Sequence, residues 1–284
     1  MRLLDAVRES SEYLEKSGIE DFFVDAELLV FHAAGMDRLT AFTENPEVGK
    51  DLSRKINRLL CRRAKGEPIQ YIIGHVEFLG LKINVGKGVL IPRPETELLA
   101  QEAIETARSK KSDLREIPRI LDLCTGSGCI ALALAREFPG ATVYGSDVSK
   151  TAIRYARMNA GLNHIRNAAF VAGSLFGPVK RDVLFDIIVS NPPYIRAADI
   201  GGLQREIREW EPVEALDGGE EGLDFYRKIL PAAIGYLREK GEILIELGFG
   251  QARDVTEMAR ESGFKNVVTK KDYAGIERIL KAEA

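Results

Sequence analysis

The chain has 284 residues, of which 45% are hydrophobic and 29% are charged. These fractions are ordinary for a globular protein and exclude a fibrous repeat or a largely disordered chain. The 40 basic and 43 acidic residues give a net charge of −3, so the chain lacks the overall basic field that drives non-specific nucleic-acid binding.

The cysteines and the N-terminal residues bear on the compartment. The three cysteines, Cys61, Cys124 and Cys129, are too few and too scattered for a disulfide framework, which favours a reducing compartment. No clustered histidines accompany them, so we expect no metal site. No apolar stretch is long enough to cross a bilayer, and the acidic residues near the N-terminus argue against a transit peptide. We therefore expect a cytoplasmic protein that does not associate with membranes.

Residues 1–66 are expected to form a small helical domain. Apolar residues recur at helical spacing around 3–14, 25–34 and 52–60, and Gly66 is placed to end the third helix. A solvated face is the simpler interpretation of the opposite side of that helix, and a docking surface for an acidic partner is the alternative. This face carries Arg54, Lys55, Arg58, Arg62 and Arg63.

Residues 67–94 are expected to form a β-hairpin linker. β-formers fill the segment from Tyr71 to Val85 and are interrupted by Gly74 and Gly80. The prolines of Ile91-Pro92-Arg93-Pro94-Glu95-Thr96-Glu97 then prevent a strand or helix from running through this segment. A helix can begin within it, at the first glutamate.

From residue 95 onward, helical and strand patterns alternate. Strands are predicted at 118–123, 141–146, 168–172, 184–190, 242–247, 265–270 and 276–281. Helices are predicted at 95–108, 128–137, 149–160, 223–238 and 250–262. The alternation predicts an α/β fold, in which a mostly parallel sheet of seven strands is covered by helices on both faces. Such sheets bind ligands beyond the carboxyl ends of their strands, so functional residues are expected just after each strand.

A glycine-rich turn follows the first predicted strand of this sheet. It comprises Cys124, Thr125, Gly126, Ser127 and Gly128. Glycines let the backbone pass close to a ligand, and Asp147, at the tip of the second strand, can accept hydrogen bonds from both ribose hydroxyls of an adenosine. The pairing fits a dinucleotide-binding fold about as well as a methyltransferase. Two features favour the methyltransferase: Asp122 can hold the turn or reach a methionine amine, and Ala131 replaces the third glycine of G-x-G-x-x-G.

The segment Asn191-Pro192-Pro193-Tyr194 follows the fourth predicted strand. Two successive prolines fix φ and keep the residue before each of them extended. The Asn191 side chain and the Pro192 carbonyl can then be held as two acceptors, with the ring of Tyr194 beside them. Two such acceptors take both N–H protons of a planar nitrogen, aim it, and stabilise the positive charge that develops during methylation. Asparagine suits this role because it accepts a hydrogen bond without burying a charge.

Taken together, these segments resemble the release factor glutamine N5-methyltransferases, the HemK family. The resemblance covers nearly the whole chain and rests on Pro68–Gly74, Phe78–Leu81, Ile91–Glu97, Asp122–Gly128, Ser190–Tyr194, Glu211-Pro212 and Gly222–Tyr226. It implies a seven-stranded Rossmann-like class I methyltransferase domain over residues 95–284. A helical domain over 1–66 would dock the substrate, and the hairpin over 67–94 would link the two.

The resemblance also implies a reaction and its residues. A methyl group would pass from S-adenosyl-L-methionine to the side-chain amide nitrogen (N5) of the glutamine in the Gly-Gly-Gln motif of peptide-chain release factors, which act in translation termination. Catalysis would fall to Asn191, Pro192 and Tyr194, which would hold the glutamine together with Pro193. Cys124 stands where the family more often has glycine. The cofactor would contact Cys124, Thr125, Gly126, Ser127, Gly128, Asp147, Phe176 and Asn191.

Other functions stay open at this point. An adenine-N6 DNA or RNA methyltransferase also grips a planar amino group, but it calls for a basic groove and a target-recognition region, so no direct nucleic-acid substrate is expected. A glutamine methyltransferase acting outside translation is a further alternative. A nicotinamide oxidoreductase would leave Asn-Pro-Pro-Tyr without a role. A non-catalytic binding module fits least, because both halves of the site are intact.

Overall fold

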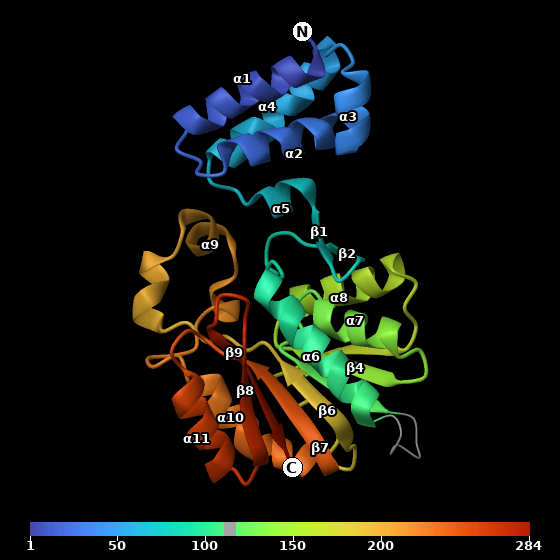
Figure 1. Cartoon of the computed structure of the whole chain (residues 1–284), viewed down its shortest axis with the longest axis vertical. Helices are drawn as coiled ribbons and strands as arrows, with labels where there is room; N and C mark the ends of the chain where they lie inside the picture. The colour runs from blue at the N-terminus through green and yellow to red at the C-terminus, as the bar shows by residue number, and fades with distance from the viewer. Residues whose placement is uncertain (111–117) are drawn as a thin grey trace. The chain divides into compact units, whose positions relative to one another are not determined.

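The computed structural model describes residues 1–110 and 118–284, and these divide into two compact units (Figure 1). The helical unit comprises Met1–His75 together with Gln204–Trp210. The sheet unit comprises Val76–Leu203 together with Glu211–Ala284. A short segment late in the sequence therefore belongs to the unit that the N-terminal residues form.

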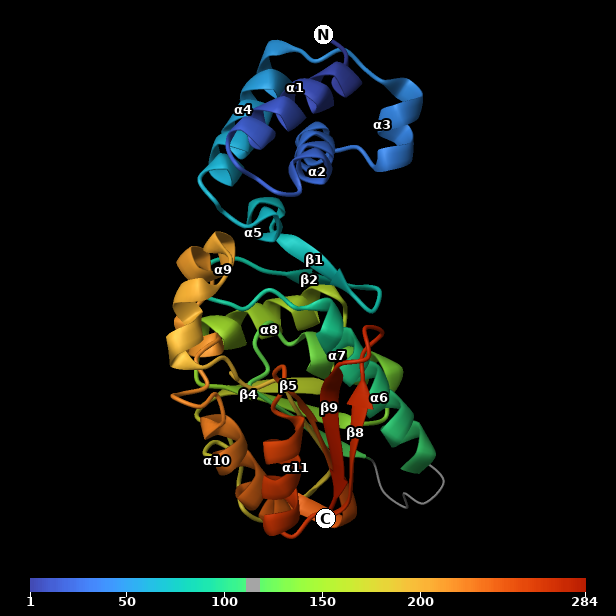
Figure 2. The ribbon, with the colours of Figure 1, turned by 60° about the vertical axis from the view of Figure 1, so that its left-hand side comes forward.

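The helical unit is built on three mutually packed helices, α1, α2 and α4 (Figure 2). Its apolar core, which includes Leu3, Leu14, Leu29 and Ile56, follows the helical spacing of the sequence. Helix α4 is followed by Gly66 at a φ of +87°, the left-handed conformation expected of a glycine just past a helix end. The helices of the unit are α1 (Leu3–Lys16), α2 (Phe22–Ala34), α3 (Arg38–Glu44), α4 (Lys50–Ala64), α5 (Ile69–Ile73) and α9 (Arg205–Trp210).

The predicted hairpin is shorter than expected, because its first part is helical. Strands β1 (His75–Phe78) and β2 (Leu81–Asn84) form a two-stranded sheet, but the β-formers before them make helix α5. Ile69 and Ile72, three residues apart, both enter the core of the helical unit. Burial of this helical face overrides the local β preference of the sequence.

The basic face predicted on α4 is also partly wrong. Arg63 is buried, with Nε 2.6 Å from Asp25 Oδ2 and Nη1 2.8 Å from Glu206 Oε2. Arg62 is paired with Glu67. Part of the predicted face lies inside the unit, because the segment 204–210 packs there and brings Glu206 to Arg63. The helical spacing of α4 alone does not reveal this distant partner.

The sheet unit contains a seven-stranded sheet with the order β5-β4-β3-β6-β7-β9-β8, in which β9 runs antiparallel to β7 and β8 and the other neighbouring pairs are parallel. The predicted α/β class I methyltransferase fold is confirmed. Its strands are β3 (Arg119–Leu123), β4 (Thr142–Asp147), β5 (Ala168–Ala172), β6 (Phe185–Ser190), β7 (Leu237–Glu246), β8 (Lys265–Lys271) and β9 (Glu277–Glu283). No helix among the described residues is long and apolar enough to cross a membrane.

Helices cover both faces of this sheet (Figure 1). One face carries α6 (Pro94–Lys110), α7 (Cys129–Glu137) and α8 (Lys150–Leu162), and the other carries α10 (Asp224–Ala233) and α11 (Ala252–Glu261). Three 3-10 turns, at Ala197–Gly202, Val213–Ala215 and Ile234–Tyr236, were not predicted. The last of them replaces the end of the helix predicted at 223–238.

The register of the sheet brings the predicted site segments to one edge. Leu123, the last residue of β3, pairs with Ser146 of β4 on one side and with Ser190 of β6 on the other. The residues that follow these three positions are Cys124, Asp147 and Asn191. Parallel strands end at a common edge, so the glycine turn, the acid and the Asn-Pro-Pro-Tyr segment leave the sheet side by side.

Candidate active site

The turn after β3 combines one tightly packed glycine with one open one. Gly128 has a φ of +83°, and a Cβ added to it would lie 2.9 Å from the Ala156 Cβ, so close packing requires glycine there. Gly126 has a φ of +55°, and a Cβ added to it would meet nothing within 4 Å. Cys124 adopts a φ of +58°, which is unusual for a side-chain-bearing residue. The turn therefore keeps its left-handed form at Cys124 without a glycine at this position.

Asp122 fastens both ends of this turn from within β3. Its Oδ2 accepts hydrogen bonds from Thr125 Oγ1 at 2.6 Å and from the Ala131 amide at 3.1 Å. Its Oδ1 is buried without a hydrogen-bond partner among the described residues. Burial, helped by the charge of Asp147, raises the pKa of this carboxyl to about 7 against the lowering effect of the two hydrogen bonds.

Asp147 is fixed beside the turn. Its Oδ2 accepts from the Gly126 amide at 2.9 Å, and its Oδ1 accepts from the Ser149 amide at 2.8 Å. Burial raises the pKa of Asp147 above its ordinary value, although both backbone hydrogen bonds lower it. A carboxylate oxygen can accept more than one hydrogen bond, so both oxygens keep capacity for a ligand's hydroxyl groups.

Phe176 and Ser127 complete the part of the site predicted for a cofactor. Phe176 is buried and stacks on Tyr236, with ring centroids 4.5 Å apart and planes 11° apart. One face of its ring is therefore covered by the protein. The Ser127 hydroxyl is buried without a partner among the described residues, like Oδ1 of Asp122.

These features fit a ligand that combines an adenosine with an amino acid. The open approach at Gly126 admits a ligand close to the backbone, and Asp147 offers acceptors for ribose hydroxyls. The unpartnered oxygens of Asp122 and Ser127 could bond a polar group such as an amine. Within the described parts of the chain, no cluster of His, Cys, Asp or Glu could hold a metal ion.

Asn191 begins the second half of the site and is oriented by a network that the sequence did not reveal. Its Nδ2 donates to Thr96 Oγ1 at 2.9 Å. The Thr96 hydroxyl donates to Glu246 Oε2 at 2.8 Å, and the Tyr194 hydroxyl donates to Glu246 Oε1 at 3.1 Å. Asn191 and Tyr194, predicted as a site, are thus joined through two residues that were not. A weak signal existed, because Glu246 ends an apolar strand at the carboxyl edge, as Asp147 does.

Glu246 is a nearly fully buried carboxyl. Burial raises its pKa to about 7, and the charge of Glu95 acts in the same direction. The hydrogen bonds from Thr96 and Tyr194 and the charge of Arg278 lower its pKa. Burial and the charge of Glu246 also raise the pKa of the Tyr194 phenol, so this hydroxyl keeps its proton and donates.

The remainder of the Asn-Pro-Pro-Tyr segment is held through its backbone. Pro192 and Pro193 are buried, and the carbonyl of Tyr194 accepts from Gln251 Nε2 at 2.9 Å. A Cβ added to Gly222 would lie 2.5 Å from that carbonyl oxygen, so the glycine is required for the contact. The segment is therefore clamped on both sides.

Glu211 anchors the chain just before α6. This buried glutamate accepts from the Ile91 amide at 3.1 Å through Oε2 and from Arg93 Nη2 at 2.6 Å through Oε1. Because α6 begins at Pro94, the anchor fixes the helix turn that carries Thr96. The two motifs Ile91–Glu97 and Glu211-Pro212 thus act on the site through the same contact.

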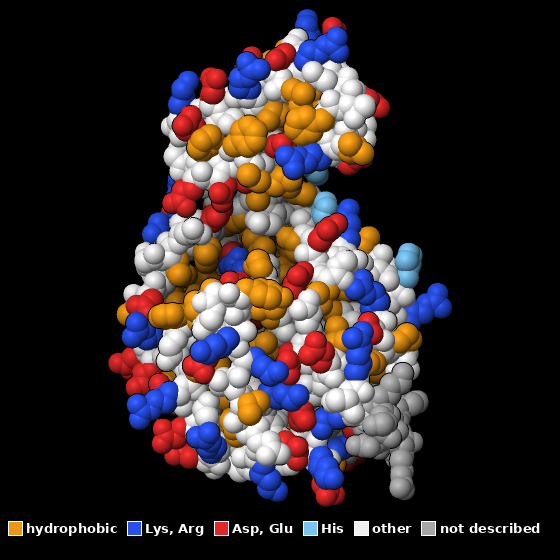
Figure 3. All heavy atoms as spheres, viewed as in Figure 1, with side chains coloured by type: hydrophobic (Ala, Val, Ile, Leu, Met, Phe, Trp, Pro, Cys, Tyr) orange, Lys and Arg blue, Asp and Glu red, His pale blue; other side chains and the backbone are white. Residues whose placement is uncertain are grey.

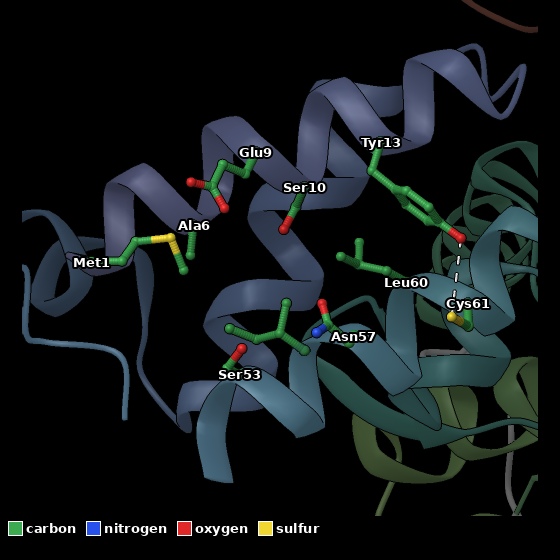
Figure 4. Close-up of a pocket in the computed structure, with 10 residues that line it drawn as sticks. Met1, Ala6, Glu9, Ser10, Tyr13, Ser53, Asn57, Leu60 and Cys61 are labelled. Carbon is green, nitrogen blue, oxygen red and sulfur yellow. Dashed lines mark hydrogen bonds between the residues drawn. The ribbon is translucent and has the colours of Figure 1, made fainter. Parts of the chain in front are cut away.

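A separate groove lies in the helical unit, between α1 and α4 (Figure 4). It has a volume of about 470 Å³, and the Tyr13 hydroxyl lies 4.0 Å from Cys61 Sγ at one end. Its lining also includes Glu9, Ser10 and Asn57. Among these described residues nothing resembles the paired acceptors at the end of β6.

Comparisons with known proteins identify relatives of both units. A family model described as the PrmC N-terminal domain matches residues 5–74, and one described as the methyltransferase small domain matches residues 99–205. The release factor glutamine methyltransferase of Thermodesulfovibrio yellowstonii is 44% identical over 280 residues, covering 99% of this chain and 97% of that protein. The protein of the same name from Geobacter sulfurreducens is 44% identical over 270 residues, covering 94% and 92%.

Solved structures share the fold at lower identity. The hMettl16 catalytic domain, solved in complex with MAT2A 3′UTR hairpin 6, has a TM-score of 0.56 and 19% identity, covering 79% of this chain and 81% of that one. At this identity the likeness shows the fold alone.

Proposed function

The chain belongs to the family of release factor glutamine methyltransferases, and from this premise we propose its cofactor, substrate and catalytic residues. The protein transfers a methyl group from S-adenosyl-L-methionine to N5 of the glutamine in the Gly-Gly-Gln motif of peptide-chain release factors. The position of Asn191 carries the proposal. This residue leaves the sheet beside the glycine turn, and its amide nitrogen is bonded to Thr96, which leaves its Oδ1 as an acceptor.

S-adenosyl-L-methionine would supply an electrophilic methyl group on its sulfonium. The residues of this chain would bind it at the carboxyl edge of β3 and β4. In this proposal Asp147 accepts from the ribose hydroxyls, the backbone from Cys124 to Gly128 lies against the ligand, and Phe176 lies near the adenine. Asp122 Oδ1, which has no hydrogen-bond partner among the described residues, would accept from the amine.

Asn191 and Pro192 orient the substrate glutamine. An amide nitrogen is a poor nucleophile because its lone pair is delocalised, so the two acceptors must aim it. Asn191 Oδ1 and the Pro192 carbonyl accept its two N–H protons and stabilise the positive charge on the nitrogen. The transfer would form the new N–C bond as the C–S bond of the donor broke, and the nitrogen would then lose one proton to water. Pro193 keeps the Pro192 carbonyl in place, and the Tyr194 ring lies beside the glutamine.

The helical unit would dock the release factor. Much of the basic face of α4 is committed within the unit, but α2 and α3 expose apolar side chains (Figure 3). They are Phe23, Val24, Leu28, Leu39 and Phe42, which are 55%, 57%, 43%, 78% and 50% exposed. An exposed apolar group of this kind is typical of a protein contact surface. Contacts remote from the reacting glutamine would then select one side chain among many.

A direct test uses methyl-labelled S-adenosyl-L-methionine and a purified release factor. After incubation with the protein, the factor is digested and the label is located by mass spectrometry. We expect the label on the Gly-Gly-Gln glutamine, and far less of it with Asn191→Ala protein. Label on adenine in RNA or DNA oligonucleotides, with the factor unlabelled, would instead establish the adenine-N6 alternative.

A further inference from the structure

We propose that Thr96 and Glu246 are positioning residues that decide which end of the Asn191 side-chain amide faces the substrate. The inference rests on the proposed function, because it assumes that Asn191 receives the substrate glutamine. An asparagine amide has one end that accepts hydrogen bonds and one that donates, and a half-turn of the amide exchanges them. The glutamine nitrogen needs the accepting end, so one of the two orientations is unproductive.

Donor counting along the network fixes this orientation. An ionised Glu246 only accepts, and its two oxygens receive the hydroxyls of Thr96 and Tyr194. A threonine hydroxyl has one proton. Because Thr96 donates that proton to Glu246, its oxygen can only accept from Asn191. Asn191 must therefore direct its nitrogen to Thr96 and its oxygen away from it.

Burial keeps water from replacing the hydrogen bonds between Asn191, Thr96 and Glu246. Thr96 is 2% exposed and Glu246 is 1% exposed, so water does not readily take the place of either hydrogen bond. The charged groups that act on Glu246 are of both signs, with Glu95 favouring its neutral form and Arg278 its ionised form. With a pKa of about 7, the carboxyl is mostly ionised in mildly alkaline solution, where the donor count applies.

This hydrogen-bond network has a consequence for the choice of substrate side chain. A glutamate in place of the substrate glutamine offers only acceptors, and it would meet the accepting end of Asn191 unfavourably. A reversed Asn191 would turn a donor towards the substrate, and it would favour glutamate over glutamine. The ratio of affinities for the two side chains therefore reports the orientation of Asn191.

The test compares Thr96→Val with Thr96→Ser in the full chain at pH 8. Valine has the shape of threonine without the hydroxyl, and serine keeps the hydroxyl. Four quantities are measured: kcat, KM for the release factor, Kd for S-adenosyl-L-methionine, and the ratio of Kd values for release factors that carry glutamine or glutamate in the Gly-Gly-Gln motif. Thermal unfolding shows that each variant is folded.

We expect Thr96→Val to lower kcat about tenfold or more, because the buried N–H of Asn191 loses its acceptor and the reversed amide becomes favourable. Its Kd for S-adenosyl-L-methionine should stay within a factor of about two, and its preference for glutamine over glutamate should fall. Thr96→Ser should restore both kcat and the preference.

Two results would overturn the proposal. One is a Thr96→Val protein with wild-type kcat and preference. The other is a lowered kcat with the preference for glutamine unchanged, which would mean that Thr96 only supports the local structure. Failure of the proposed function itself is seen separately, because the wild-type protein would then leave the release factor unmethylated.

Discussion

The buried carboxyls Asp25 of the helical unit and Asp122 and Glu246 of the sheet unit differ in how their charge is compensated. In the helical unit, the buried Asp25 is paired with Arg63, which also bonds Glu206. In the sheet unit, Asp122 and Glu246 are buried with hydrogen-bond donors around them and no ion-pair partner among the described residues. Burial raises the pKa of both carboxyls to about 7.

The difference separates a structural use of charge from the functional use that we propose. The ion pair of the helical unit fixes α2 against α4, while apolar side chains of α2 and α3 stay exposed. Asp122 and Glu246 reduce stability when they are ionised, and they hold the two segments of the candidate site. Unpaired buried carboxyls are therefore the feature that marks the site in this protein.

The comparison is tested most strongly at Arg63. Arg63→Ala leaves Asp25 buried without its cation, and we expect a loss of about 3–5 kcal/mol in the free energy of unfolding of the helical unit. Denaturant unfolding followed by circular dichroism measures this loss. Arg54→Ala, an exposed control on the same helix, should change the free energy by less than about 0.5 kcal/mol. Equal effects of the two variants would mean that the buried pair is not structural.

Asn191→Ala should abolish most of the turnover and leave both units folded. The loss of one of two acceptors should cost about 3 kcal/mol of transition-state stabilisation, as removal of one oxyanion-hole donor does. Steady-state kinetics with a release factor measures it. Asn191→Asp keeps the shape but adds a charge, and a wild-type kcat in either variant would contradict the two-acceptor arrangement.

Asp147→Ala should weaken binding of S-adenosyl-L-methionine by about 2 kcal/mol, because charge-assisted hydrogen bonds to two ribose hydroxyls are lost. Calorimetric titration gives the dissociation constant. Asp186→Ala is a control, because this buried acid pairs with Arg238 in the same sheet away from the carboxyl edge. An unchanged dissociation constant for Asp147→Ala would remove the ribose assignment.

Asp122→Asn should change how stability depends on pH. The pKa of Asp122 is raised from 3.8 to about 7 in the folded protein. The contribution of this group to stability is therefore complete below pH 3.8, the pKa of the unfolded chain, and is lost as the pH rises from there through 7. Between pH 5 and pH 8, the stability of the variant relative to the wild type should therefore increase by about 2 kcal/mol. If the free energies of unfolding of the variant and the wild type differed by the same amount at both pH values, the pKa of Asp122 would not be raised in the folded protein.

The exposed apolar side chains of the helical unit should give the smallest effect. Leu39→Ser should raise KM for an intact release factor by a factor corresponding to about 1 kcal/mol and leave kcat unchanged. Tyr273→Ser provides a matched control, because Tyr273 is 94% exposed in the sheet unit. Equal KM values for the two variants would place docking elsewhere on the protein.

The sheet and its site were predictable for a physical reason. Strand period and turn residues are local signals, and parallel strands end at one edge, so Asp147 and Asn191 could be placed together from the sequence. Thr96 and Glu246 could not, because they are separated by 150 residues and their contact depends on how α6 packs. The burial of Arg63 was missed for the same reason, since its partner Glu206 comes from a distant segment.

The return of the chain to the helical unit at Gln204–Trp210 has a consequence for synthesis. The unit that begins at the first residue is not complete until α9 has been made. Arg63 can meet Asp25 early, but Glu206 reaches it only after most of the sheet unit has emerged, on the order of ten seconds later at ordinary translation rates. The N-terminal helices therefore lack one of their packing elements, α9, until late in translation.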